Sequence, residues 1–245
     1  MSAPILSVEG LIAGYEPGLP IVNGASMHAA RGEIVALLGP NGAGKSTLIK
    51  EIAGLMKVSA GAVTFDGADI TRLPAHKRIG VGLAFTPQTE NVFAAMSVED
   101  NLKLAAGLLA KADRPARTEA MFSTFPDLAR QRGLLAGRLS GGQRQMLAIA
   151  RALIVGPKAL MLDEPSAGLS PKFVDMVFGK LAEIRAGGVT IVLVEQNTRA
   201  ALALADRAYV LVQGRNRRDG PAKVLRDDPD IAALYLGGLE TERAS

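Results

Sequence analysis

One nine-residue segment, GPNGAGKST at residues 39–47, restricts the possible folds of this chain more than any other feature. It matches the pattern G-x-x-x-x-G-K-[ST], and it lies between a predicted buried strand that ends at Leu38 and a predicted helix from Gly44 to about Ala53. Because glycines let the backbone curl, successive N–H groups in such a loop point at phosphate oxygens at the start of a helix. The sequence therefore predicts a strand–loop–helix unit that binds phosphate.

The positions of this loop have predicted roles. Lys45 is predicted to reach the β- and γ-phosphates of a nucleotide, and the Ser46 hydroxyl is predicted to bind Mg²⁺. A glycine-rich turn that binds nothing is the alternative, and the predicted strand and helix on either side argue against it. The candidate phosphate-binding residues are Gly39, Pro40, Asn41, Gly42, Ala43, Gly44, Lys45, Ser46 and Thr47.

Predicted strands and helices alternate along most of the chain, which favours parallel strands joined by crossover helices. Residues 97–138 differ, because they carry long helical patterns interrupted by Pro115 and Pro126 as helix breakers. We expect one α/β domain over residues 1–245 with a mainly parallel sheet and a helical sub-domain inserted at about residues 90–155. The other strands are predicted at residues 5–8, 62–65, 81–85, 159–162, 189–194 and 208–212, and further helices at 171–185 and 198–205. The strand at 62–65 is followed by Asp66-Gly67, which predicts a hairpin with a tight turn.

A second motif consists of two acidic residues at the end of the predicted strand at 159–162. Asp163 suits the magnesium partner that phosphate-loop proteins require, and Glu164 is placed to polarise an attacking water. An apolar run that ends in Asp-Glu is weak on its own, since it usually marks only the end of a strand. Together with the phosphate loop it indicates nucleotide hydrolysis.

A third motif, LSGGQ at residues 139–143, precedes a helix predicted from Arg144 to Leu153. Free N–H groups at a helix start form a second anion site, which a second chain packed head to tail could lay over the first chain's nucleotide. An ordinary glycine-containing helix cap is the alternative for an isolated Ser-Gly-Gly. The candidate residues are Ser140, Gly141, Gly142 and Gln143.

The composition limits the partners and the cellular compartment that we expect for this chain. The net charge is +4 and aromatic residues make up 4%, so we expect no nucleic-acid partner, and we interpret Arg215, Arg217 and Arg218 as a solvated turn. Cysteine is absent, which fits a reducing compartment. The first ten residues do not resemble a secretory signal, and no stretch is long and apolar enough to span a bilayer. We expect any membrane role to come through a partner.

These three motifs together resemble the ATP-binding subunits of ABC transporters, over about residues 5–239. The resemblance implies a P-loop NTPase core of the RecA-like type, an N-terminal antiparallel β portion and a helical sub-domain. It implies ATP and Mg²⁺ as cofactors, and ATP hydrolysis that drives solute transport. The implied partners are membrane-spanning permease subunits, a second ATP-binding subunit in a homo- or heterodimer and, indirectly, an external solute-binding protein. The implied location is peripheral, at the cytoplasmic face of the inner (plasma) membrane.

The resemblance also assigns roles to isolated positions. Tyr15 lies where the family stacks an aromatic ring on adenine, although alone it would suit a half-buried strand. Gln88 lies where a loop glutamine contacts Mg²⁺ and couples to the permease. Residues 90–101 are then the expected docking surface. Its candidate apolar anchors, which equally suit the core of the sub-domain, are Val92, Phe93 and Met96.

Two positions depart from the family pattern. Gln196 occupies the place of a histidine that the family usually carries, and glutamine can bond a γ-phosphate but cannot take up a proton. Ser170 stands where an aspartate is common. Both put turnover at this chain's own site in doubt, and we list Gln196 with Glu164 as candidate catalytic residues.

The departures point to a subfamily. The runs VEQN at 194–197, QMLAIARAL at 145–153 and YLGG at 235–238 resemble one of the two ATPase subunits of branched-chain amino acid importers. We therefore expect an unequal pair, in which this chain lends residues 139–143 to a more active site on its partner.

Several alternatives stay open. A urea or amide importer is the nearest, because its ATPase subunits share the glutamine, whereas lipopolysaccharide exporters usually keep the histidine. A regulatory subunit that binds ATP and barely hydrolyses it is a further alternative, which Gln196 favours and Glu164 opposes. Soluble ABC ATPases of DNA repair or translation are disfavoured, because this chain has neither sustained heptads nor a second such domain.

Overall fold

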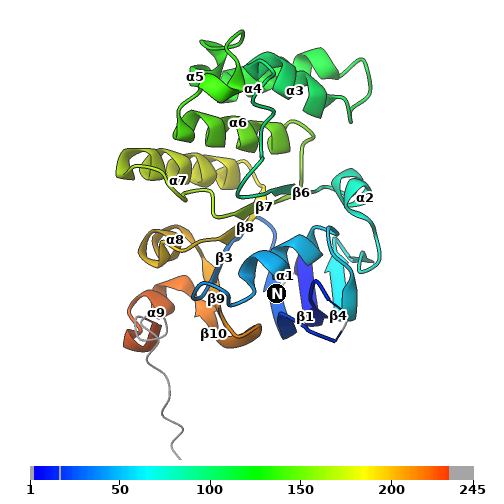
Figure 1. Ribbon diagram of the computed structural model, residues 1–245, viewed down its shortest axis with the longest axis vertical. Helices are drawn as coiled ribbons and strands as arrows, with labels where there is room; N and C mark the ends of the chain where they lie inside the picture. The colour runs from blue at the N-terminus through cyan, green and yellow to red at the C-terminus, as the bar shows by residue number, and fades with distance from the viewer. Residues whose placement is uncertain (1–2, 17, 232–245) are drawn as a thin grey trace, which may run out of the picture.

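The computed structural model describes residues 3–16 and 18–231, and Figure 1 shows their arrangement. The helices between residues 98 and 153 form an upper tier, and the helix at 171–186 lies beneath them. The main sheet runs from the middle of the view to the lower left, level with the strands at 6–13 and 58–65 on the lower right. The run at 235–238 that supported the subfamily resemblance lies outside the described residues.

The main sheet contains six strands in the order β10-β9-β3-β8-β7-β6. Its first pair, β10 and β9, is antiparallel, and every other pair is parallel. The central strands β3, β7 and β8 are buried along their whole length, as expected for a parallel sheet covered on both faces. The strands are β3 (Ile34–Leu38), β6 (Leu83–Thr86), β7 (Ala159–Asp163), β8 (Thr190–Val194), β9 (Arg207–Val212) and β10 (Arg215–Pro221).

A second sheet is antiparallel, in the order β2-β1-β4-β5. The turn between β4 and β5 uses Asp66 at φ 51° and Gly67 at φ 81°, which is the conformation that Asp-Gly favours in two-residue hairpins. This confirms the predicted hairpin and the predicted N-terminal antiparallel portion. The strands are β1 (Leu6–Ala13), β2 (Val22–Ala29), β4 (Val58–Phe65) and β5 (Ala68–Asp69).

The helices fall into two groups. Those of the upper tier are α3 (Val98–Ala106), α4 (Arg114–Thr124), α5 (Pro126–Ala129), the 3₁₀ turn η1 (Ala136–Arg138) and α6 (Gly141–Leu153). The others accompany the sheets: α1 (Lys45–Ile52), α2 (Ala75–Gly80), α7 (Pro171–Ala186), α8 (Thr198–Leu204) and α9 (Ala222–Arg226).

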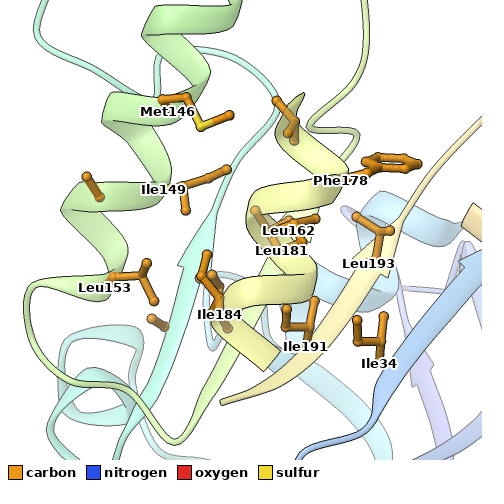
Figure 2. Close-up of a cluster of buried hydrophobic side chains, with 14 of the residues drawn as sticks. Ile34, Met146, Ile149, Leu153, Leu162, Phe178, Leu181, Ile184, Ile191 and Leu193 are labelled. Atoms are coloured by element: carbon orange, nitrogen blue, oxygen red, sulfur yellow. The ribbon is translucent and has the colours of Figure 1, made fainter. Parts of the chain in front are cut away.

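Packing between α6, α7 and the main sheet joins the upper tier to the core. In Figure 2, Met146, Ile149 and Leu153 of α6 face Leu181 and Ile184 of α7. Residues of the strands, including Leu162, Ile191 and Leu193, extend the same cluster. Burying each such side chain contributes about 1.5–3 kcal/mol, so this cluster is a main source of stability.

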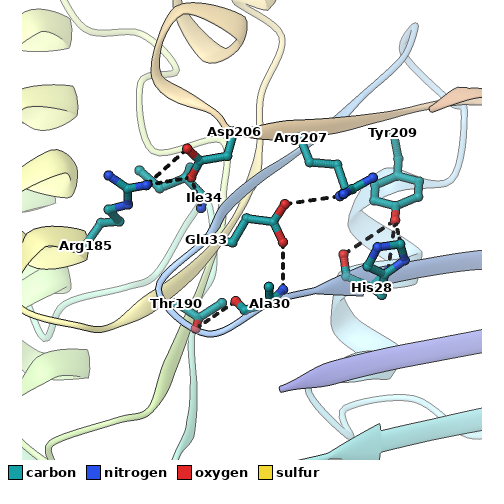
Figure 3. A network of polar contacts seen from close by, with 9 residues as sticks. All are labelled: His28, Ala30, Glu33, Ile34, Arg185, Thr190, Asp206, Arg207 and Tyr209. Atoms are coloured by element: carbon teal, nitrogen blue, oxygen red, sulfur yellow. Dashed lines mark hydrogen bonds and ion pairs between the residues drawn. The ribbon is translucent and has the colours of Figure 1, made fainter. Parts of the chain in front are cut away.

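A polar network fixes the amino-terminal ends of the central strands (Figure 3). Glu33 accepts hydrogen bonds from the Ala30 N–H at 2.7 Å and from Arg207 at 3.1 Å. Asp206 accepts from the Ile34 N–H at 2.9 Å and from Arg185 at 3.1 Å. These charged contacts lie at the amino-terminal ends of the strands, so they do not occupy the carboxyl ends of the strands.

The structure corrects three predictions. Arg215, Arg217 and Arg218 do not form a turn but lie on β10, an edge strand that tolerates charges because water covers its open side. Pro115 lies in the first turn of α4 rather than breaking a helix, since the first helical positions need no N–H donor. Pro126 does follow a break, because α4 ends before the non-helical Phe125 and α5 begins at Pro126. The helix predicted from Arg144 begins at Gly141.

No helix within residues 3–16 and 18–231 is long and apolar enough to cross a membrane.

Candidate functional site

Four adjacent strands of the main sheet bring predicted site residues to one edge. The phosphate loop follows β3, Gln196 follows β8, Asp163 and Glu164 end β7, and Gln88 follows β6. Because these strands are parallel, their carboxyl ends meet at the same edge, where α/β proteins bind ligands. The fold therefore gathers residues that are far apart in the sequence.

The phosphate loop is held close to the turn after β9. A Cβ added to Gly39 would lie 2.1 Å from the Leu211 carbonyl oxygen, so only glycine fits there. The Gly214 N–H donates to the Ala43 carbonyl at 2.9 Å, which anchors the middle of the loop. Gly44 then caps α1 at φ 94°, a left-handed conformation that places the first free N–H groups of the helix at the loop.

Lys45 and Ser46 make the polar contacts of the loop. Lys45 is 5% exposed, and its Nζ donates to the carbonyls of Gly39 at 2.8 Å and Pro40 at 3.0 Å. Burial lowers the pKa of Lys45, and the nearby carboxylates of Glu164 and Asp163 oppose that shift. The Ser46 hydroxyl donates to Asp163 Oδ1 at 2.9 Å, so the loop is joined directly to β7.

Asp163 is 3% exposed, and burial raises its pKa, while the bond from Ser46 acts in the opposite direction. A buried carboxylate of this kind is stabilised by a cation, and Ser46, Gln88 and Asp163 offer the oxygen ligands that Mg²⁺ prefers. Within the described residues no three His, Cys, Asp or Glu side chains cluster as a metal site.

Glu164 accepts hydrogen bonds from the loops that follow β6 and β8. Gln88 and Gln196 both donate their Nε2 to the same oxygen, Oε2 of Glu164, each at 2.7 Å. Glu164 itself is 8% exposed and has a backbone φ of 49°, which is uncommon outside glycine and is found at functional sites. Both predicted glutamines therefore contact the predicted base.

Residues 140–143 lie elsewhere in the same chain. Ser140 caps α6: its hydroxyl accepts from the Gln143 N–H at 3.3 Å, and the Gln143 side chain accepts from the Ser140 N–H at 3.0 Å. A Cβ added to Gly142 would lie 2.2 Å from the Phe173 ring of α7, so glycine is needed for this packing. The segment packs on α7 and Leu169, not on the phosphate loop.

Tyr15 is not brought into contact with the other predicted residues. It follows β1, its side chain is 63% exposed, and it forms no hydrogen bond or ring contact within the described residues. The half-buried strand position that would suit a lone tyrosine is therefore wrong, and an open aromatic face is available there.

Two residues at this edge were missed by the sequence reasoning. Glu195 directly follows β8 and is 1% exposed, and it accepts hydrogen bonds from the backbone and side chain of Ser166. The second residue is Ser166. Glu195 could have been identified from the sequence, because it directly follows four buried apolar residues and precedes Gln196.

A parallel sheet with a phosphate loop after β3 and a carboxylate pair after β7 defines a nucleoside triphosphate-binding protein of the P-loop class. Within that class the chain belongs to the ABC transporter family, whose model matches residues 22–167, and it is one of the family's ATP-binding subunits.

Similar proteins cover nearly the whole chain. The probable branched-chain amino acid transport ATP-binding protein LivF of Archaeoglobus fulgidus is 45% identical over 95% of this chain and 99% of its own length. BraG of Pseudomonas aeruginosa, a high-affinity branched-chain amino acid transport ATP-binding protein, is 38% identical over 93% and 97%. The lipopolysaccharide export ATP-binding protein LptB of Escherichia coli is 35% identical over 95% and 97%.

Solved structures agree with the fold. A crystal structure of the ADP conformation of an ATP-binding cassette from an ABC transporter superposes with a TM-score of 0.84 at 28% identity, covering 96% of this chain and 100% of the other. The predicted α/β fold class and the predicted family are thus confirmed.

Proposed function

We propose that this chain hydrolyses ATP to energise an importer for branched-chain amino acids. The observation that carries the proposal is the convergence of the phosphate loop, Asp163, Glu164, Gln88 and Gln196 at the ends of four neighbouring strands. That edge combines a phosphate cradle, oxygen ligands for a cation and a base within reach of a water.

Lys45 and the free N–H groups at the start of α1 bind the triphosphate. The carbonyls of Gly39 and Pro40 hold the Lys45 ammonium in the loop, so little side-chain ordering remains when phosphate oxygens replace them. Ser46 and Asp163 would hold the cation, and Gln88 would be a further ligand. When bound, Mg²⁺ neutralises charge on the β- and γ-phosphate oxygens.

Glu164 accepts the proton of the attacking water. In this structure its Oε2 is occupied by Gln88 and Gln196, so both amides move or rotate when nucleotide and water enter. We expect Glu164→Gln to keep MgATP binding and to lower the hydrolysis rate by about 10²- to 10⁴-fold, the usual contribution of a general base. Equal rates in a phosphate-release assay would remove Glu164 from this role.

A second chain completes the site. The 140–143 segment packs on α7 and not on its own chain's phosphate loop, which supports its use on the nucleotide of a partner. Since Gln196 cannot take up a proton, we propose that the pair is unequal and that the partner site turns over faster.

The unequal pair is tested by comparing ATPase rates of the purified chain and its Gln196→His variant. We expect the variant to be faster by at least about tenfold, because histidine adds proton transfer at that position. A wild-type homodimer that already hydrolyses ATP as fast as the complete transporter would contradict the asymmetry.

A groove between β6 and the upper tier supports docking of the permease. It has a volume of about 450 Å³, and its lining includes Phe93, Leu104 and Leu108, which are 48%, 50% and 64% exposed. Arg151 also lines the groove, and its guanidinium lies 4.7 Å from the Phe93 ring centroid. Of the three candidate anchors, Phe93 is the exposed one, while Val92 packs against the core.

The identity of the solute rests on the relatives named for branched-chain amino acid transport. A transporter reconstituted with its external binding protein is expected to hydrolyse ATP faster when leucine, isoleucine or valine is supplied. Stimulation by urea or a short amide in their place would favour the alternative importer. In this role the chain sits on the cytoplasmic face of the plasma membrane, attached through the permease subunits.

A further inference from the structure

Glu195 is a buried carboxylate at the edge that carries the candidate site. It directly follows β8, and its side chain is 1% exposed. Burying a charged carboxylate is costly unless hydrogen bonds compensate, and burial raises its pKa accordingly, against the effect of the bonds from Ser166. The burial of this carboxylate must therefore be compensated by its hydrogen bonds.

Both oxygens of Glu195 accept hydrogen bonds from named groups. Oε1 accepts from the Ser166 N–H at 3.0 Å, and Oε2 accepts from the Ser166 hydroxyl at 2.8 Å and from the Gln196 N–H at 3.2 Å. Ser166 is itself 8% exposed and belongs to the loop that follows β7. One side chain thus joins the loops of two neighbouring strands.

These contacts close a ring around Glu164. Glu164 is joined through Pro165 to Ser166, Ser166 is bonded to Glu195, and Glu195 is followed by Gln196. Gln196 returns to Glu164 through its Nε2 at 2.7 Å. Glu164 has the uncommon φ of 49°, which persists only where surrounding contacts determine it. The ring through Glu195 is one set of such contacts, beside the hydrogen bond from the Glu164 N–H to the Val194 carbonyl at 2.9 Å.

We propose that Glu195, acting through Ser166 and Gln196, is a positioning residue for Glu164. The inference rests on the proposed role of Glu164 as the base. A carboxylate suits the position because it only accepts hydrogen bonds, whereas a glutamine would turn an N–H group towards the Ser166 hydroxyl and the Gln196 N–H. Residues 167–170, which follow Ser166, are mostly exposed, so Glu195 also links that surface to the base.

The kinetic test uses the full-length chain with Glu195→Gln, Ser166→Ala and the double variant. Each single variant is expected to lower kcat for MgATP about tenfold while KM stays within about twofold, because a displaced base slows the chemistry without weakening nucleotide binding. The double variant should be no slower than the slower single variant, since both break one ring. Ser166→Thr, which keeps the hydroxyl, should restore most of kcat.

Glu33→Gln is the matched control. Glu33 also accepts a backbone hydrogen bond, from Ala30 at 2.7 Å, but at the opposite end of the sheet, and its variant should leave kcat unchanged. A kcat for Glu195→Gln within twofold of the wild type, or additive losses in the double variant, would overturn the proposal.

Hydrogen exchange provides a readout that needs no turnover. Glu195→Ala is expected to speed amide exchange in residues 166–170, which lie in the loop after β7, whereas Glu33→Ala is not. Unchanged exchange there would overturn the proposal by itself. A wild-type chain that binds no MgATP would contradict the proposed function instead, and the exchange result would still decide whether Glu195 holds this loop.

Discussion

At the scale of single residues, Glu51 is the buried group with the least compensation. It lies on α1 at 0% exposure, and neither carboxylate oxygen has a hydrogen-bond partner in the part of the chain that the structure describes. Burial raises its pKa to about 7 from an ordinary value of 4.5. The folded state therefore holds the Glu51 proton more tightly than the unfolded state does.

This shift sets the direction of a pH dependence. A raised carboxyl pKa favours the folded state at low pH, and that advantage disappears as the pH rises from 4.5 to about 7. Above that range the ionised Glu51 costs about 3 kcal/mol. We expect Glu51→Met to raise the free energy of unfolding by about 2–3 kcal/mol at pH 8 and by much less at pH 5.

Urea denaturation at the two pH values checks the prediction, with Glu51→Gln as a control that removes the charge and keeps a polar group. If the difference between wild type and Glu51→Met is the same at both pH values, the ionisation of Glu51 is not its cause.

At the scale of elements, Asn101 of α3 fixes the segment that lines the groove proposed for permease docking. It is 0% exposed; its Oδ1 accepts from the Phe93 N–H at 2.9 Å, and its Nδ2 donates to the carbonyls of Phe93 at 3.0 Å and Ser97 at 2.9 Å. The backbone of Phe93, which carries the exposed ring, is therefore held by a buried side chain of α3.

Asn101→Leu keeps the size of the side chain and removes these bonds. Leaving buried backbone groups unpaired costs about 1–3 kcal/mol each, so the denaturation midpoint should fall. Capture of the chain by solubilised permease should fall as well, because Phe93 loses its fixed position, while MgATP binding stays unchanged.

Asn216→Leu is the control for Asn101→Leu, because it makes the same substitution away from the groove. Asn216 exchanges two 2.8 Å hydrogen bonds with Ser26 and joins β10 to β2, so its loss should lower stability without affecting capture. Full permease capture by Asn101→Leu would show that the segment does not depend on Asn101.

The elements that the sequence predicted best were those with a strong local signal. Three elements formed where glycines end or begin apolar runs. They are the strand before the phosphate loop, the helix after it and the hairpin at Asp66 and Gly67. Strand β10 was missed because it lies at the sheet edge, where charged residues carry no burial pattern. Its pairing depends on β9, which no local pattern of residues 215–221 reveals.

At the scale of the whole molecule, the fold class followed from the alternation of strands and helices, and the family from three short motifs. The strand order that brings Gln88 and Gln196 onto one oxygen of Glu164 could not be predicted from spacing, because it depends on which strands become neighbours. The role of Glu195 was hidden for the same reason. Its partner, Ser166, comes from a neighbouring strand.

The central claim is that the loop of residues 39–47 binds MgATP through Lys45. Calorimetric titration of MgATP into the full-length chain tests it most directly, with Lys45→Ala as the disabling variant and Lys57→Ala, an exposed lysine beyond α1, as the matched control. We expect saturable heat for the wild type and for Lys57→Ala, and at least about tenfold weaker binding for a folded Lys45→Ala, because the buried ammonium is lost from the triphosphate site. Absence of binding heat in the wild type, or equal affinity in Lys45→Ala, would contradict the account.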